Sequence, residues 1–448
     1  MPRIFGTDGI RGRANVDVTP ELALQLGRAV ARVLREEGHG RPEVVVGRDP
    51  RWSSPMLEDA LAAGLASGGA DVRSLGVVAT PVVAHAAAAT EVQAGAMISA
   101  SHNPMADNGI KFFGHDGFKL TDAEEDRIEE LLTQPGRDHG RPVGDEVGQI
   151  VEDHALVDDW ADSVVSVGGD LAGLTVVVDA ANGSASALGP EVYRRLGATV
   201  IPIHADPDGR NINLDCGSTH PQSLIDAVVS HGADVGIAHD GDADRLVAVD
   251  HRGVEVDGDV ILAILARDAH ESGSLPHDTV ATTVMTNLGF RRAMRDLGIG
   301  VELTRVGDRY VMEAMRSGGL TLGGEQSGHL IALDHSTTGD GILSAAMLLS
   351  TIAAAGVPLA ELRTVMTRLP QVLINVAGVD KHRLADAAHV EDVIAKVTDD
   401  LGDDGRVLVR PSGTEALIRV MVEAVTEDDA QAGARAIADA VRTTLASA

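Results

Sequence analysis

One unit occurs three times along this chain of 448 residues and restricts the fold more than any other feature. Residues 42–78, 175–203 and 279–306 each contain an apolar β-branched run, a polar loop, a helical segment and a second apolar run. An unbroken run of this kind is typical of a strand that is covered on both faces, as in parallel sheets. Each helical segment stops at a glycine suited to a left-handed cap, namely Gly69, Gly197 and Gly298. The repeat therefore predicts three similar α/β domains with mixed, largely parallel sheets.

The pattern changes after residue 369. Residues 371–379 and 406–424 are predicted to be strands, and residues 389–401 and 427–445 are predicted to be helices. This arrangement is typical of a smaller α+β domain. We therefore predict four domains, with boundaries at residues 1–155, 156–255, 256–369 and 370–448.

The charge balance excludes several classes of partner. A net charge of −30 argues against nucleic acid or an anionic membrane as a partner, and an anionic substrate would need local clusters of Arg or Lys. The single cysteine, Cys216, rules out an internal disulfide and suits a reducing compartment. The N-terminal segment lacks the apolar stretch of a signal peptide, and the most apolar segment, residues 342–360, contains Ser, Thr, Gly and Pro. We expect a soluble, cytoplasmic protein.

The first motif with chemical content is AMISASHNPMADNGIKFFG, residues 96–114, in which a polar loop follows a predicted buried strand. Its polar side chains include Ser99, Ser101, His102, Asn103 and Lys111. A plain turn accounts for Ser, Asn and Pro on local grounds, so that interpretation stays open. No Gly-x-Ser-x-Gly elbow surrounds the serine, which argues against a hydrolase. Two of the chain's four lysines follow closely, however, and a cation near a hydroxyl suits a phosphorylated serine or a bound phosphate.

The second motif is an acidic segment after another predicted strand. Asp240, Asp242 and Asp244 stand at alternate positions and offer three hard oxygen ligands, which suit Mg²⁺. An EF-hand is excluded because Arg245 and His251 occupy the positions that need Gly and Glu. An aspartyl-phosphate phosphatase motif is excluded because Thr or Val is missing at its required position. Three crowded carboxylates are costly without a cation, so a solvated turn is the weaker interpretation.

Two further motifs are rich in glycine or arginine. In residues 321–332, paired glycines allow close approach of the backbone to a ligand, and Glu325, Ser327 and His329 suit sugar hydroxyls. An ordinary turn explains this segment equally well. In residues 406–420, two guanidinium groups and two hydroxyls flank a flexible turn, as in phosphate recognition. The residues concerned are Arg410, Ser412, Gly413, Thr414 and Arg419. No lysine follows a glycine anywhere, which excludes a Walker A loop.

Taken together, these motifs resemble those of the α-D-phosphohexomutase superfamily, over the whole chain. The resemblance rests on four segments in order: SASHNP as phosphoserine loop, DGDADR as metal loop, GEQSGH as sugar loop and RPSGTE as phosphate loop. The order of the four segments and the domain-sized distances between them make the resemblance specific. The segments IFGTDGIRG and STTGDGI, together with Gln326, are similar to the branch that acts on glucosamine phosphates.

The resemblance implies interconversion of glucosamine 6-phosphate and glucosamine 1-phosphate, on the route to UDP-N-acetylglucosamine and peptidoglycan. Ser101 would carry the phosphoryl group, and one Mg²⁺ per subunit would lie between it and Asp240, Asp242 and Asp244. A hexosamine 1,6-bisphosphate would be intermediate and activator. It would turn over in a central cleft between the four domains, the last of which would be mobile.

The resemblance also distributes roles among the other site residues. The negative charge of the transferring phosphoryl group would be neutralised by Arg11, Lys111 and Arg245. His102, Lys111 and His329 each stay open as the acceptor of the attacking hydroxyl's proton. Glu325 and Ser327 would contact the sugar, and the residues of the phosphate loop would hold the non-reacting phosphate. Two alternatives remain: a mutase for glucose or mannose phosphates, and a non-catalytic, metal-bound sugar-phosphate sensor. The sequence leaves a homodimer open.

Overall fold

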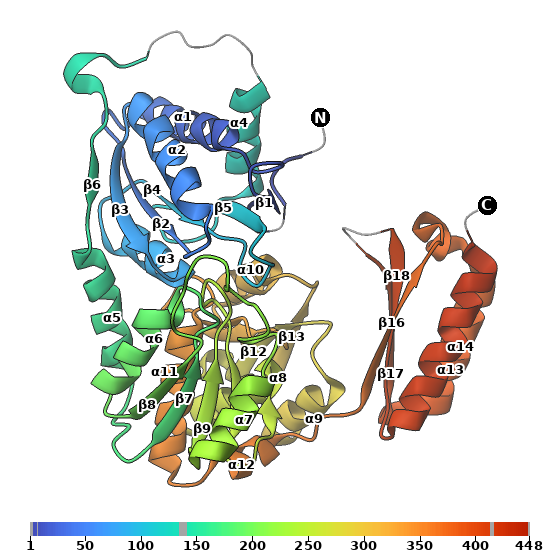
Figure 1. Cartoon of the computed structure of the whole chain (residues 1–448). Helices are drawn as coiled ribbons and strands as arrows, with labels where there is room; N and C mark the ends of the chain where they lie inside the picture. Colours follow the sequence, from blue (N-terminus) through green and yellow to red (C-terminus); the bar gives the residue numbers. More distant parts are fainter. Residues whose placement is uncertain (1–2, 7, 134–140, 413–415, 447–448) are drawn as a thin grey trace. The chain divides into compact units, whose positions relative to one another are not determined.

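The computed structural model describes residues 3–6, 8–133, 141–412 and 416–446 (Figure 1). The chain forms two compact units. The first contains residues 1–285 and 299–364, and the second contains residues 286–298 and 365–448.

The first unit begins with a six-stranded sheet in the order β1-β5-β4-β2-β3-β6. Its strands are β1 (Ile10–Arg13), β2 (Glu43–Arg48), β3 (Asp71–Val77), β4 (Ala94–Ile98), β5 (Asp107–Gly114) and β6 (Ile150–Glu152). Its helices are α1 (Pro20–Glu36), α2 (Ser54–Ser67), α3 (Thr80–Ala89) and α4 (Asp122–Thr133). Leu26 of α1 and Leu61 of α2 share a buried core with Val44 of the sheet. On the opposite face, Val83 of α3 packs where glycines in β2 and β4 leave room.

Two further sheets follow in the first unit, in the orders β11-β10-β9-β7-β8 and β13-β12-β14-β15. The strands are β7 (Thr175–Asp179), β8 (Thr199–Ile203), β9 (Val235–Ala238), β10 (Val247–Asp250), β11 (Glu255–Val256), β12 (Thr279–Thr283), β13 (Gly300–Thr304), β14 (Leu322–Gly324) and β15 (Leu330–Ala332). The helices are α5 (Ala155–Val167), α6 (Ala185–Arg195), α7 (Gln222–His231), α8 (Gly258–Glu271), α10 (Asp308–Gly318), α11 (Gly341–Ala355) and α12 (Leu359–Leu362).

The predicted repeat is confirmed in all three copies. Each first strand pairs in parallel with the second strand of its unit, as β2 with β3, β7 with β8 and β12 with β13. The three predicted cap glycines have positive φ angles of 90°, 103° and 77° at Gly69, Gly197 and Gly298. The three sheets are mixed and largely parallel, as expected.

The structure also extends each unit by two strands. The first of them was predicted in two units, as the buried strand before the motif, and the second was not predicted. A further strand pairs in parallel with the first strand of each unit, as β4 with β2, β9 with β7 and β14 with β12. The chain then turns back antiparallel into β5, β10 and β15. We name the three connections the first hairpin loop (residues 99–106), the second hairpin loop (239–246) and the third hairpin loop (325–329). Each carries one of the predicted motifs of the first three domains.

The second unit is the expected α+β structure. Its strands β16 (Gln371–Ala377), β17 (Arg406–Pro411) and β18 (Leu417–Glu423) form an antiparallel sheet in the order β16-β18-β17. Helices α13 (Ala388–Leu401) and α14 (Glu427–Leu445) cover one face of this sheet (Figure 1). Helix α9 (Leu288–Leu297) belongs to this unit as well, because the Asn287 side chain bonds the backbone N–H and C=O of Leu369.

Two local predictions are also settled. Thr121 and Glu124 form the capping box expected at α4, with reciprocal bonds of 2.6 and 3.4 Å between side chains and backbone N–H groups. The apolar segment after residue 341 forms helix α11, most of which is buried. Among the described residues, no single helix has the length and apolar content to cross a membrane; α11 passes that test only jointly with Leu359–Val365, across a 96° bend.

The buried N-cap of α11 makes stability depend on pH. The Asp340 carboxylate accepts hydrogen bonds from the backbone N–H of Leu343 (2.9 Å) and from Nε1 of Trp160 (3.1 Å). Burial outweighs these bonds and raises the pKa of Asp340 to about 6. A raised carboxyl pKa contributes stability that is present at low pH and is lost as pH rises through the folded-state value.

We therefore compare the free energy of unfolding of the wild type with that of Asp340→Asn at pH 5 and at pH 8. As pH rises from 5 to 8, we expect the wild type to lose about 1 kcal/mol more than the variant. Urea unfolding of both proteins at the two pH values measures this difference. Asp439→Asn, an exposed change on α14, serves as the control. An equal gap between wild type and Asp340→Asn at both pH values would contradict the assignment.

Candidate active site

The first hairpin loop holds Ser101 in a buried and strained position. Its φ angle is 52°, a left-handed value that costs a non-glycine residue about 1 kcal/mol. The Oγ atom donates a 2.5 Å hydrogen bond to Oδ2 of Asp240 in the second hairpin loop. The first and second loops, about 140 residues apart in sequence, therefore meet at this hydroxyl, as the resemblance implied.

The three carboxylates of the second hairpin loop converge. One oxygen from each of Asp240, Asp242 and Asp244 lies within 4.8 Å of the others, and all three residues are buried. The buried Oδ1 atom of each makes no hydrogen bond to any part of the chain that the structure describes. Burial, and then the charges of Asp244 and Asp242, raise the pKa of Asp240 to about 8. Orphaned oxygens that repel one another fit a divalent cation with a preference for oxygen ligands.

A buried lysine balances part of this negative charge. Nζ of Lys111, on β5, lies 2.8 Å from Oδ2 of Asp242 and 3.4 Å from Oδ2 of Asp244. Burial alone would lower the pKa of Lys111, but Asp242, Asp8 and Asp244 raise it well above its usual value. Lys111 is therefore a fixed cation beside the carboxylates.

A second group of charges surrounds this lysine, and sequence reasoning missed most of it. Asp8 pairs with Lys111, with Lys119 and with the predicted residue Arg11. Lys119 also pairs with Asp308, the first residue of α10. Burial opposes ionisation of Asp8, but the three cations hold its pKa well below the usual range. The chain thus places a network of alternating charges against the site, between its first and third sheets.

The two predicted histidines have opposite electrostatic environments. His102 Nδ1 lies 3.3 Å from the Ser101 hydroxyl, and burial, with Arg245 and Arg11, lowers the pKa of His102 to about 4. Nδ1 of His329 lies 3.8 Å from Asp244, and its Nε2 lies 3.5 Å from Asp308. Burial would lower the pKa of His329, but these carboxylates raise it overall. Arg245 approaches Asp244 to 3.8 Å and Asp240 to 4.0 Å.

The third hairpin loop docks on the second. The backbone N–H of Leu246 donates to the carbonyl of Gly328 (2.9 Å). Arg245 and His329 are paired by an isolated antiparallel β-bridge between the two loops. Within the third loop, Glu325 accepts a bond from the N–H of Gly307 (3.1 Å), and burial raises the pKa of its carboxyl. Ser327 is exposed. Glu325 and Ser327 therefore lie on the same loop as His329, whose ring contacts Asp244.

Arg51 is the main residue that sequence reasoning missed. It is fully buried, and its guanidinium donates to the carbonyls of Ser101, Asn103, Pro104 and Asp107 at 2.6 to 3.1 Å. Asp49 fixes it through a 2.7 Å ion pair and also accepts a bond from the Ser99 hydroxyl. Arg51 thereby holds the backbone that gives Ser101 its left-handed angle. The only sequence signal was its place in the polar loop of the first repeat.

The resemblance implies that Ser101 carries a phosphoryl group. On that basis we expect Arg51→Lys to lower kcat by about 10- to 100-fold, because an ammonium cannot donate to all four carbonyls and Ser101 then shifts out of line. Steady-state turnover and the rate of Ser101 phosphorylation by a hexose 1,6-bisphosphate measure the effect. The control is Arg48→Lys on β2, a half-buried arginine that pairs with Glu58. Wild-type turnover in Arg51→Lys would show that the fork is not needed for alignment.

The predicted phosphate loop lies in the second unit, at the connection between β17 and β18. Arg410 and Arg419 stand directly opposite each other in the strand register. Burial, and then the charge of Arg419, lowers the pKa of Arg410, as expected of two neighbouring cations. Nζ of Lys381, another residue that sequence reasoning missed, donates to the carbonyl of Ser412 at 2.7 Å. Gly413 and Thr414 lie outside the described residues.

The fold and site define a phosphohexomutase: three repeated α/β domains that bring together a buried serine, three carboxylates and fixed cations, plus an α+β domain. Models of the phosphoglucomutase/phosphomannomutase family match all four domains: α/β/α domain I at residues 2–138, domain II at 158–253, domain III at 257–369 and the C-terminal domain at 373–440. The chain belongs to this family.

Relatives refine this assignment. The chain is 54% identical to the phosphoglucosamine mutase of Frankia alni, over 99% of both chains, and 53% identical to that of Mycolicibacterium gilvum, over 98% of this chain and 99% of that one. A phosphoglucomutase/phosphomannomutase family protein of Burkholderia thailandensis is similar in structure, with a TM-score of 0.84, 26% identity and coverage of 99% and 97%. The N-acetylphosphoglucosamine mutase of Aspergillus fumigatus, solved with GlcNAc-6P and magnesium, has the same fold at 17% identity (TM-score 0.70, coverage 98% and 95%).

Proposed function

We propose that this enzyme interconverts glucosamine 6-phosphate and glucosamine 1-phosphate through a phosphorylated Ser101 and a glucosamine 1,6-bisphosphate intermediate. The observation that carries the proposal is the placement of the Ser101 hydroxyl against Asp240, within a buried carboxylate trio that Lys111 flanks. The names of the relatives at 54% and 53% identity support the choice of amino sugar. The product would feed UDP-N-acetylglucosamine and peptidoglycan synthesis in the cytoplasm.

Phosphoryl transfer requires alignment and charge neutralisation more than covalent help from the protein. Asp240, Asp242 and Asp244, with an oxygen of phosphorylated Ser101, would hold one Mg²⁺, which supplies positive charge beside the transferring group when bound. Lys111, Arg245 and Arg11 would cover the remaining charge. The fixed ion pairs of Lys111 keep that cation in place through both transfers.

Three side chains remain candidates for accepting the proton of the attacking hydroxyl. His102 lies 3.3 Å from the serine Oγ, whereas Lys111 and His329 both face carboxylates. Glu325 and Ser327 would bind sugar hydroxyls that look alike in the two orientations of the bisphosphate. The loop of Arg410, Ser412, Gly413, Thr414 and Arg419 would hold the non-reacting phosphate, and Lys381 would support that loop through Ser412.

Side-by-side turnover of the 6-phosphates of glucosamine, glucose and mannose tests the proposal, with Mg²⁺ and catalytic hexose 1,6-bisphosphate present. We expect the kcat/KM for glucosamine 6-phosphate to be at least about tenfold higher than for the other two substrates. A tenfold ratio corresponds to about 1.4 kcal/mol of transition-state discrimination. Phosphopeptide mapping should find the phosphate on Ser101. A higher kcat/KM for glucose or mannose phosphate would reassign the substrate, and an enzyme that is never phosphorylated would overturn the mechanism.

A further inference from the structure

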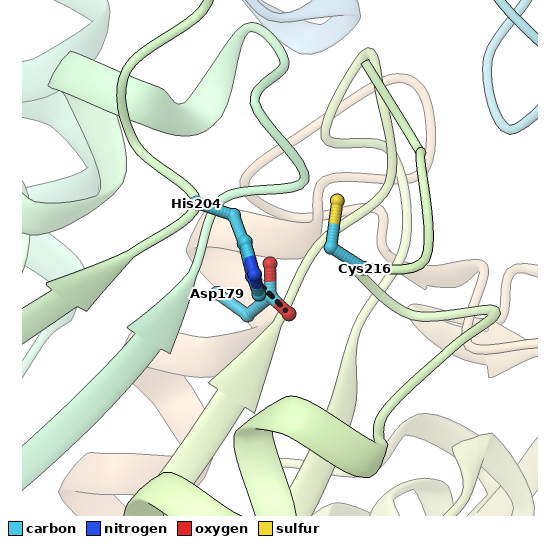
Figure 2. A group of neighbouring side chains, drawn as sticks. All are labelled: Asp179, His204 and Cys216. Carbon is cyan, nitrogen blue, oxygen red and sulfur yellow. Dashed lines mark ion pairs between the residues drawn. The ribbon is translucent and has the colours of Figure 1, made fainter. Parts of the chain in front are cut away.

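A second group of potential metal ligands lies in the second domain, apart from the carboxylate trio. Asp179 ends β7, His204 follows β8 directly, and Cys216 lies in the loop between β8 and α7. Figure 2 shows the Asp179 carboxylate beside the His204 ring, with the Cys216 side chain next to them. One ligand atom from each lies within 4.8 Å of the others. Because β7 and β8 are parallel neighbours, their carboxyl ends bring these residues together.

The donor set differs in kind from that of the trio. It offers one oxygen, one ring nitrogen and one sulfur, whereas Asp240, Asp242 and Asp244 offer oxygens alone. Mixed sets with a thiolate and an imidazole favour Zn²⁺ and similar borderline cations, while carboxylate sets favour Mg²⁺. The two clusters should therefore select different metals.

The surroundings of the three ligands hold them in orientation. Backbone N–H groups of Ala181 and Gly217 bond the two Asp179 oxygens at 2.9 Å each, and Nδ1 of His204 lies 3.1 Å from Oδ2. The Asn182 amide faces Cys216 Sγ at 3.9 Å and accepts a bond from the Asp206 N–H, which fixes its orientation. An amide N–H beside a sulfur is the kind of outer contact that stabilises a metal-bound thiolate.

Access is possible from one side. Asp179 and Cys216 are fully buried, but 31% of the His204 side chain is exposed, so an ion can enter past the imidazole. Burial, with Asp179, raises the pKa of the Cys216 thiol to about 12. An ion that binds there must displace the thiol proton, and its affinity should therefore rise with pH.

We propose that Asp179, His204 and Cys216 form a binding site for a borderline divalent cation such as Zn²⁺, separate from the magnesium site. The chain from His204 to Cys216 also carries Asn213, whose amide bonds the carbonyls of Ser101 (2.9 Å) and Asn103 (3.2 Å). A bound ion would link both ends of the segment from His204 to Cys216 to Asp179 at the end of β7. This segment contacts the first hairpin loop through Asn213.

Cobalt titration of the full-length, chelator-treated protein in excess Mg²⁺ tests the site. Co²⁺ bound by Cys216, the only cysteine, gives a thiolate-to-cobalt charge-transfer absorption, and Zn²⁺ should abolish it by competition. We expect this band at one equivalent in the wild type and in Asp242→Asn, and no band in Cys216→Ser. His204→Ala, a change at a partly exposed position, should weaken the apparent affinity at least about tenfold.

Cobalt that binds without a charge-transfer band overturns the proposal, as does a band whose midpoint is unchanged in His204→Ala. The band must also be independent of protein concentration, since a contribution that grows with concentration indicates bridging between molecules and contradicts an intramolecular site. Circular dichroism of each variant confirms that a lost band does not come from unfolding.

Discussion

Ser101→Ala is expected to lower kcat for the interconversion of glucosamine phosphates by at least about 10⁴-fold. The change removes the oxygen that lies 2.5 Å from Asp240 and that would carry the phosphoryl group. Without it, each transfer would have to occur directly between two sugar phosphates, which the site is not arranged to align. A coupled assay of glucosamine 1-phosphate formation measures turnover, and intact mass measures phosphorylation after treatment with hexose 1,6-bisphosphate.

The neighbouring hydroxyl provides a matched control. Ser99 lies in the same loop, but its Oγ contacts no carboxylate of the trio: it donates to Asp49 at 2.7 Å and accepts a bond from the backbone N–H of Ser101 at 2.9 Å. We expect Ser99→Ala to become phosphorylated and to keep measurable turnover, with reduced thermal stability because the Asp49 network loses a bond. If Ser101→Ala gained a phosphate, or turned over at a rate close to that of Ser99→Ala, Ser101 would not be the carrier.

Asp242→Asn is expected to lower kcat by about 10³-fold, in the range seen when a preorganised charge contact to a transition state is removed. Asp242 occupies the centre of the site: its Oδ2 accepts bonds from Nζ of Lys111 (2.8 Å) and from Oγ1 of Thr80 (2.7 Å). An amide at this position would weaken cation binding by the trio and would remove the principal partner of Lys111. Turnover against Mg²⁺ concentration, before and after chelator treatment, measures both effects.

The control is Asp215→Asn, an exposed aspartate with a φ angle of 51° that asparagine tolerates well. It should keep the wild-type dependence on Mg²⁺. Full activity of chelator-treated wild type, or an unchanged Mg²⁺ midpoint in Asp242→Asn, would show that the trio does not hold the metal used in the reaction.

The features that sequence reasoning recovered are local. The alternation of strand, helix and strand depends on neighbouring residues, so the three parallel pairs and the positive φ angles at Gly69, Gly197 and Gly298 could be predicted. Asp240, Asp242 and Asp244 could be predicted as one group because they lie within five residues of one another in the loop that follows one strand. Bringing Ser101 to them required the resemblance to a known family, since no local pattern links positions 139 residues apart.

The features that it missed depend on tertiary contacts. Arg51 looks like any arginine of a polar loop, because its importance comes from carbonyls about 50 residues away. The charges of Asp8, Lys119 and Asp308 likewise acquire meaning only when the first and third sheets come together. The hairpin of the third domain was invisible for another reason: β14 and β15 have three residues each, which is too short for a periodic signal.

The equivalence of the three hairpin loops separates specificity from chemistry. The three loops, proposed to carry the phosphoryl group, to hold the cation and to bind the sugar, occupy the same topological position in three different sheets. Each rests on its own strands, so a change at the exposed Ser327 can alter the proposed sugar contacts without touching Ser101, whereas Gly328 and His329 contact the second hairpin loop and Asp244. A scaffold with this modularity can diversify its substrates one loop at a time while the transfer machinery stays constant.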